Sequence, residues 1–509
     1  MADELIAETL TGKLQGATAD SVLSFKGIPY AAPPVGAARF QPPGSPVPWS
    51  DIRDATRFGA RAVQNERAFS LAPAVLEVFA AGLPEPASED CLFLNVWTPA
   101  LADGGDRPVM VWLHGGAFIS GSGATPWYDG SNLAAKGNVV VVTLNHRLGA
   151  FGFSYLTEIG GAEFASSGNV GMLDIVAALT WVRDNIAKFG GDPDNVTIFG
   201  ESGGGAKACV LMAMPAARGL FRKAIVESGP AVEMMAPADA TLTARQVMKE
   251  LGIATAHDMV AAPAEKLIAA QNAVLARISA LSFANRRRQG FNPVIDGAIL
   301  PAGPFAPEAP AIAASIPLMI GTNRDEMNLF FSHAPWTEGL NDTSLVEAAR
   351  NFVGDRAGAI VAAYRAARPT ASPRDLVLAI ATDQSIRLPS LTIADRKVAQ
   401  HGAPTFVYLF TWATPVVDGK LGSCHALEIP FVFDNLDKTR LTGDAPTRGV
   451  LADAMSRAWI EFAYKDNPNH AGIPYWPAYN STERPTMILD LQCRVENDPL
   501  SAERKAWSA

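Results

Sequence analysis

Short runs of apolar residues recur along the chain, and most of them are followed by a polar or glycine-containing loop. Continuous apolar runs without alternation are typical of strands that are buried on both faces of a parallel sheet. A longer segment, 172–189, is predicted to be a helix between two of these runs. The order strand, loop, helix, strand predicts an α/β fold. The predicted strands are 108–113, 138–144, 196–199, 223–226, 317–320 and 405–410.

Other regions depart from this pattern. The first 60 or so residues are rich in Gly and Pro, which predicts short strands and turns laid over a surface. Residues 68–86 are apolar but broken by proline and glycine, and we interpret them as a flap. Helical insertions are expected at about 235–290 and 335–400, above the sheet.

Composition narrows the range of functions. The chain is 48% hydrophobic with a net charge of −9, and its scattered basic residues do not form the clustered face that nucleic-acid binding requires. No apolar run reaches the roughly 20 residues that span a bilayer. The N-terminus lacks the basic start and apolar run of a signal peptide, so we expect a cytoplasmic protein. The four cysteines are widely spaced without a C-x-x-C pair, which predicts free thiols and no metal site.

A glycine-rich turn at 200–204 reads Gly-Glu-Ser-Gly-Gly and fits the pattern G-x-S-x-G. It follows the predicted strand 196–199 and precedes small residues that are predicted to be helical. This is the context of a nucleophile elbow, in which a strained turn exposes the serine hydroxyl and the next helix directs N–H groups at developing negative charge. A turn without function is the alternative, but the flanking strand and helix favour Ser202 as a nucleophile.

A second glycine-containing loop, 114–118 (His-Gly-Gly-Ala-Phe), follows the predicted strand 108–113. It resembles the loop that supplies oxyanion donors in lipases and esterases. The backbone N–H groups of Gly116, Ala117 and Gly203 are predicted to form a three-donor oxyanion hole. Alone, the loop is equally well interpreted as a turn that ends a strand. Its presence together with the serine turn favours a role in binding the oxyanion.

With these motifs the chain resembles the type-B carboxylesterases, the family that includes cholinesterases and bacterial para-nitrobenzyl esterases. Similarity to the bacterial para-nitrobenzyl esterases is strongest. Segment 189–204 matches the family's serine signature, and 89–96 (Glu-Asp-Cys-Leu-Phe-Leu-Asn-Val) matches its second signature. Segments 25–31, 145–152 and 428–433 are further landmarks. The resemblance implies an α/β-hydrolase fold, with a mostly parallel sheet flanked by helices and helical insertions around a lid or gorge. It also implies hydrolysis of small carboxylic esters without a metal or organic cofactor.

The resemblance implies the other members of a catalytic triad. The acid stands in a G-x-x-x-D-E context and is Glu326, while the histidine precedes the E-I-P-F motif and is His425. Ser228 stands where a serine supports the histidine, although a buried structural serine is nearly as good an interpretation. Length alone suggests roughly three domains. Because the site would draw on residues from about 114 to 425, we expect one catalytic domain over residues 1–509, as a monomer or homodimer.

The chain departs from the family pattern at three positions. Gly203 replaces the usual alanine, which keeps the N–H group and predicts a looser turn. Met327 follows the acid where glycine is common, which predicts a narrower pocket. Segment 63–65 lacks the cysteine that pairs with the equivalent of Cys91 in secreted relatives, so Cys91 is expected to be free.

Apolar and aromatic side chains are expected to line the ester pocket. An arginine run at 286–288 reads most simply as a solvated surface, and the sharper hypothesis is that it receives an anionic substrate. Two alternatives stay open: the same triad acting on amides, carbamates or thioesters, and a non-catalytic binding protein, which the intact triad disfavours. The pocket candidates are Phe118, Phe291, Phe330, Trp412 and Arg288.

Overall fold

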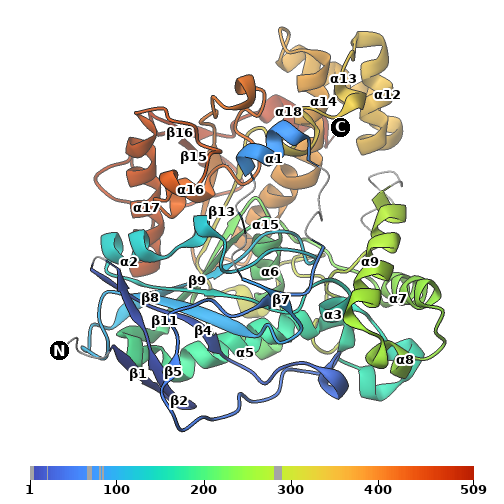
Figure 1. The fold of residues 1–509 in the computed structure, drawn as a ribbon. Helices are drawn as coiled ribbons and strands as arrows, with labels where there is room; N and C mark the ends of the chain where they lie inside the picture. The colour runs from blue at the N-terminus through green and yellow to red at the C-terminus, as the bar shows by residue number, and fades with distance from the viewer. Residues whose placement is uncertain are drawn as a thin grey trace.

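The computed structural model of the protein describes residues 5–19, 21–65, 71–79, 82, 85–279 and 289–508. Its central feature is an eleven-stranded sheet (Figure 1). From one edge to the other the strands are β16 (Arg494–Asn497), β15 (Pro485–Leu489), β14 (Thr405–Phe410), β13 (Leu318–Asn323), β12 (Lys223–Glu227), β11 (Gly191–Glu201), β9 (Arg107–Leu113), β10 (Val140–Leu144), β8 (Phe93–Thr98), β4 (Val22–Pro29) and β3 (Ala17–Ala19).

The middle of this sheet, from β15 to β10, is parallel. The strands at its margins, β16 on one side and β8, β4 and β3 on the other, pair antiparallel. Every strand that the sequence predicted is present within the parallel part, so the predicted α/β fold with a mostly parallel sheet is confirmed. Strands β9, β10, β12, β13 and β14 are buried along their full length, as their continuous apolar runs require.

Helices cover both faces of the sheet, and β9 shows how the two faces are separated. Val109, Val111 and Leu113 pack into one apolar core, whereas Met110 and Trp112 pack into a second core on the opposite face. The first core includes residues of α5 (Val170–Asn185) and α6 (Gly203–Leu211), and the second includes α2 (Ser131–Gly137) and α17 (Arg448–Lys465). This division follows from the two-residue period of a strand.

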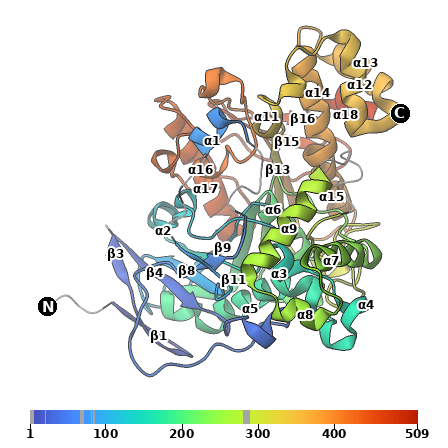
Figure 2. The same ribbon diagram turned by 45° about the vertical axis from the view of Figure 1, so that its right-hand side comes forward.

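Two groups of helices stand outside the layers next to the sheet (Figure 2). The first is α7 (Pro237–Leu251), α8 (Ala256–Ala261) and α9 (Ala264–Ser279). The second is α12 (Asp342–Val353), α13 (Ala357–Ala367) and α14 (Pro373–Thr382), which α18 (Ser501–Ala506) joins. At the other end of the chain, β1 (Ile6–Thr9), β2 (Gly12–Gln15) and β5 (Arg53–Asp54) form a separate three-stranded sheet.

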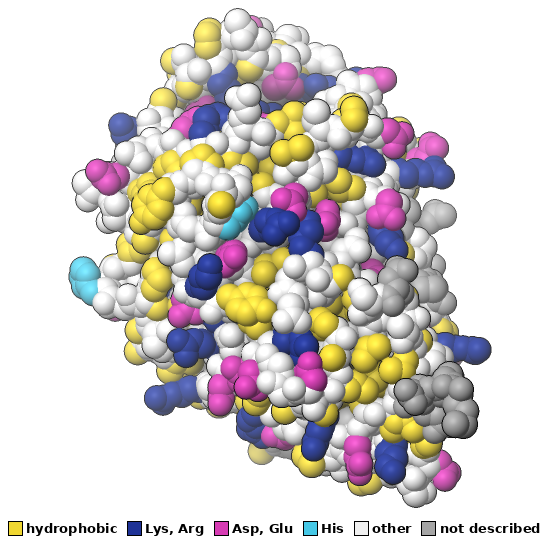
Figure 3. Space-filling view, turned by 90° about the vertical axis from the view of Figure 1, so that its left-hand side faces the viewer, with side chains coloured by type: hydrophobic (Ala, Val, Ile, Leu, Met, Phe, Trp, Pro, Cys, Tyr) yellow, Lys and Arg dark blue, Asp and Glu magenta, His cyan; other side chains and the backbone are white. Residues whose placement is uncertain are grey.

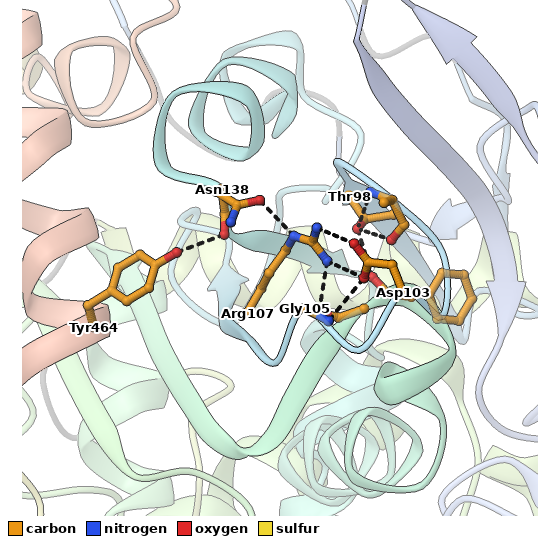
Figure 4. A network of polar contacts seen from close by, with 9 residues as sticks. Thr98, Asp103, Gly105, Arg107, Asn138 and Tyr464 are labelled. Carbon is orange, nitrogen blue, oxygen red and sulfur yellow. Dashed lines mark hydrogen bonds and ion pairs between the residues drawn. The ribbon is translucent and has the colours of Figure 1, made fainter.

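A polar network fixes the amino-terminal end of β9 (Figure 4). The guanidinium of Arg107 binds both carboxylate oxygens of Asp103 at 2.7 and 2.6 Å, and its Nε donates to Asn138 Oδ1 at 2.7 Å. The hydroxyl of Tyr464, on α17, donates to the carbonyl oxygen of Asn138 at 2.9 Å. The network therefore ties the start of a central strand to a helix on one face, at the end of the strand remote from residues 114–118.

None of the helices in the described part of the chain combines the length and the apolar character needed to cross a bilayer. On the face in Figure 3, basic and acidic side chains are interspersed rather than gathered by sign.

Candidate active site

The predicted site residues gather where parallel strands end. Ser202 directly follows β11, the loop 114–117 follows β9, Glu326 follows β13, and His425 lies in the connection after β14. Parallel neighbours in a sheet end at the same edge, which is where open α/β sheets bind their ligands. The topology thus brings together residues that are far apart in sequence.

Ser202 has the backbone conformation of a nucleophile elbow. Its φ of 55° and ψ of −121° are rare for a residue with a side chain, so the turn is strained. Ser202 N donates to Glu227 O, at the end of the neighbouring strand β12, at 2.8 Å, and Ala206 N donates to Ser202 O at 3.0 Å at the start of α6. A Cβ on Gly229 would lie 1.9 Å from Ser202 O, so glycine is required beside the turn.

His425 and Glu326 are in direct contact. His425 Nδ1 lies 2.6 Å from Glu326 Oε2, and both side chains are buried. The other carboxylate oxygen, Glu326 Oε1, accepts a hydrogen bond from Asn323 N at 2.7 Å. A neutral imidazole that donates from Nδ1 keeps Nε2 unprotonated, which is the form a general base needs.

The sequence interpretation missed the partner of the other imidazole nitrogen. Nε2 of His425 lies 3.1 Å from Glu201 Oε1, on the residue before the serine, whereas no hydrogen bond joins Ser202 to His425 among the described residues. Burial lowers the pKa of His425, but the carboxylates of Glu201 and Glu326 outweigh it and raise this pKa to about 9. Burial outweighs the attraction of the neighbouring imidazolium and raises the pKa of Glu201 well above its usual value. The only signal in the sequence was the acidic residue at the variable position of G-x-S-x-G.

Ser228 reaches the site through a second carboxylate. Its hydroxyl donates to Glu428 Oε1 at 3.3 Å, and Asn323 Nδ2 donates to Glu428 Oε2. Burial and the charge of Glu326 raise the pKa of Glu428 to about 7. Glu428 is the acidic residue of the E-I-P-F motif. The charges of Glu428 and His425 act on each other, so this motif lies close to the histidine in the fold.

The loop after β9 presents free backbone donors. Gly116 and Ala117 have φ angles of 87° and 52°, and within the described residues neither of their N–H groups, nor that of Gly203, makes a backbone hydrogen bond outside regular structure. A Cβ on Gly203 would lie 2.2 Å from Ala117 O. The missing methyl group lets the loop pack closely against α6, and the looser turn at Gly203 stays a prediction.

The candidate pocket residues differ in their placement. Phe330 packs beside the imidazole of His425, with ring centroids 5.3 Å apart and ring planes tilted by 48°, and Phe118 is buried directly after the loop donors. Phe291 is buried in the core that includes α5, and Trp412 packs against Phe431, with no ring contact to His425 for either. Arg288, with the rest of the run 286–288, lies outside the described residues.

The remaining expectations concern Met327 and the cysteines. Met327 packs in the apolar cluster of α12, α13 and α14, so its bulk fills that insertion.

Cys91 forms no disulfide, as predicted, and the other three cysteines are also free. Among the described residues, His, Cys, Asp and Glu side chains form no cluster of three or more that could hold a metal ion.

A mostly parallel sheet with a strained serine turn between a strand and a helix defines the α/β-hydrolase class of proteins. The model of the carboxylesterase family matches residues 3–507. The chain therefore belongs to the carboxylesterase family, and it is a hydrolase that acts on carboxylic esters.

Individual relatives agree with this assignment. The para-nitrobenzyl esterase of Bacillus subtilis (strain 168) is 41% identical over 98% of each chain. The phenmedipham hydrolase of Pseudarthrobacter oxydans is 33% identical over 95% of this chain and 94% of its own length. Among solved structures, a Geobacillus stearothermophilus carboxylesterase aligns over 99% of each chain with 38% identity and a TM-score of 0.86.

Proposed function

We propose that the protein is a serine carboxylesterase in which Ser202 is the nucleophile, His425 the general base and Glu326 the residue that orients the base. The observation that carries this proposal is the 2.6 Å contact between His425 Nδ1 and a buried carboxylate. The same imidazole contacts Glu201, the residue directly before a serine held in a strained elbow. The substrates are small-molecule esters, as the names of the relatives indicate for those proteins.

The chemistry proceeds in two halves. Ser202 Oγ attacks the ester carbonyl while its proton passes to His425 Nε2, and the carbonyl oxygen becomes an oxyanion. The N–H groups of Gly116, Ala117 and Gly203 donate to that oxyanion. The alcohol takes the proton from His425 as it leaves, and water then attacks the acyl-enzyme by the same route.

The contact between Nε2 and Glu201 sets the resting state of this mechanism. The base must exchange that contact for one with Ser202 Oγ, and catalytic hydrogen bonds are often made only when substrate is bound. The raised pKa of His425 favours the imidazolium that forms during attack, and it means that activity increases toward alkaline pH.

A labelling experiment tests the assignment of the nucleophile. A fluorophosphonate reacts quickly only with a serine that a neighbouring base activates, and peptide mapping by mass spectrometry locates the adduct. We expect the label on Ser202 and a rate that falls by at least about 100-fold in His425→Ala. A label on another residue, or an equal rate in the variant, would contradict the proposal.

A further inference from the structure

The helix that begins at Ser202 carries a lysine in an unusual environment. Lys207 lies on α6, and its side chain has no solvent exposure. Its Nζ donates to the carbonyl oxygen of His114 at 2.8 Å and stands 5.6 Å from the centroid of the Phe118 ring. Because a buried ammonium loses its hydration, such a group is costly unless the surroundings compensate for its charge.

Three features of the surroundings compensate for that charge. The His114 carbonyl accepts a hydrogen bond from it, the face of Phe118 attracts a cation, and the Glu201 carboxylate acts on it at longer range. Burial lowers the pKa of Lys207 to about 7, while Glu201 raises it. The other titratable groups coupled to it are the stacked rings of His114 and His146, whose pKa values burial and Lys207 both lower.

The position of the His114 carbonyl, which accepts the hydrogen bond from Lys207, matters more for the role of this lysine than its charge does. His114 is the first residue of the loop that carries the donors of Gly116 and Ala117, whereas the third donor, Gly203 N, opens α6. Among the described residues, the bond from Lys207 to His114 is the only hydrogen bond between α6 and residues 114–117.

We propose that Lys207 is a positioning residue for the oxyanion hole: its ammonium group holds the loop donors of Gly116 and Ala117 at a fixed distance from the donor of Gly203. Oxyanion stabilisation depends on donors that are fixed before the charge develops. A loop free to move relative to α6 binds the ground-state ester as before but stabilises the tetrahedral intermediate less well. This role rests on the proposed function of the site.

The test compares Lys207→Met with Lys397→Met. Lys397, on α15 (Leu388–Val398), is a matched control, because it is also fully buried and its Nζ also donates to a single carbonyl oxygen, that of Ala314, at 3.1 Å. The measurements are kcat and KM for para-nitrophenyl butyrate and the Ki of a trifluoromethyl ketone. Such a ketone forms a bond from its carbonyl carbon to Ser202 Oγ, sends the serine proton to His425, and becomes an oxyanion in the hole.

For Lys207→Met we expect kcat to fall by about 10- to 100-fold, less than the 10²- to 10³-fold loss from deleting a donor outright. KM should stay within about threefold, and the Ki of the ketone should rise by the same factor as kcat/KM falls. Lys397→Met should leave all three values near wild type. A Lys207→Met enzyme that matches Lys397→Met, or that changes only in KM, overturns the proposal.

If Lys207→Met does not fold, Lys207→Gln is measured in its place. Glutamine retains an amide N–H donor, one atom shorter than the lysine ammonium. We therefore expect the kcat and Ki of Lys207→Gln to lie between those of the wild type and those expected for Lys207→Met. A folded glutamine variant with wild-type kcat and Ki overturns the proposal. Failure of the proposed function itself is distinguishable, because Ser202→Ala would then hydrolyse the ester at a rate close to wild type.

Discussion

Replacing Glu201 with glutamine should move the pH dependence of catalysis in a defined direction. The carboxylate is 3.1 Å from His425 Nε2, so its attraction for the imidazolium is between about 1 kcal/mol, at the dielectric constant of water, and about 5 kcal/mol, at an effective value near 20. This range corresponds to about one to four pKa units. Loss of the negative charge makes the imidazolium less stable, so the pKa of His425 falls from its raised value of about 9.

The assay is kcat/KM for para-nitrophenyl butyrate between pH 5 and 10, with product followed at the isosbestic wavelength of nitrophenol. The general base must be neutral, so activity rises as pH passes through the pKa of His425 in the free enzyme. In Glu201→Gln this rise should occur at least about one pH unit lower than in wild type. Glu227→Gln is the control, because Glu227 pairs with Glu201 across the two strands but its carboxylate accepts from Trp459 Nε1 at 2.8 Å. An unchanged or higher transition in Glu201→Gln, or an equal shift in the control, would refute this reasoning.

Three further substitutions test separate parts of the structure. Glu326→Gln should lower kcat by about 10³- to 10⁴-fold with little change in KM, because the tautomer of the His425 imidazole is no longer fixed. Steady-state kinetics that show less than a tenfold loss of kcat would contradict this role of Glu326. Gly203→Ala should lower kcat/KM by at least about tenfold, because the new methyl group meets Ala117 O at 2.2 Å, and wild-type kinetics would mean that the loop yields without cost. Asp174→Asn should destabilise the fold by about 3 kcal/mol or more, because it breaks a buried bidentate pair with Arg147, and an unchanged urea midpoint would show that the pair contributes nothing.

The parallel strands from β9 to β14 could be predicted because their signal is local, whereas the parallel strand β15 was not predicted. Each is a run of apolar residues, and both faces of the sheet are covered. The neighbouring strand β8 was not predicted, although it is fully buried, because Asn95 interrupts its apolar sequence. The structure explains that residue only through distant partners, since Asn95 accepts from Gly27 N at 3.0 Å and donates to Thr143 Oγ1 at 2.9 Å.

The bounds of β11 illustrate a second limit. The sequence predicts residues 196–199, whereas the strand runs from Gly191 to Glu201. Its first part contains Asp192, Pro193 and Asp194, which favour turns. A register shift separates Gly191, opposite Arg107, from the regular pairing that begins at Val196. Only the pairing partner makes this segment a strand, so the local sequence could not have predicted it.

The candidate site was predicted from motifs, and its electrostatics were not. The motif G-x-S-x-G leaves Glu201 unspecified, and nothing near it in sequence indicates contact with His425. Lys207 reads in the sequence as an ordinary helical residue on α6, and its burial against the His114 carbonyl depends on how β9 and α6 pack. Charged groups that act through tertiary contacts are therefore the part of the site that the sequence analysis lacked.

The most direct test of the central claim is the release of nitrophenolate from para-nitrophenyl butyrate by the wild-type protein and by Ser202→Ala, both shown to be folded by circular dichroism. The mechanism predicts rapid turnover by the wild type and a loss of at least about 10⁴-fold in the variant, because the nucleophile is gone. Turnover by Ser202→Ala at a rate close to wild type would contradict the assignment of Ser202 and, with it, the proposed acyl-enzyme mechanism.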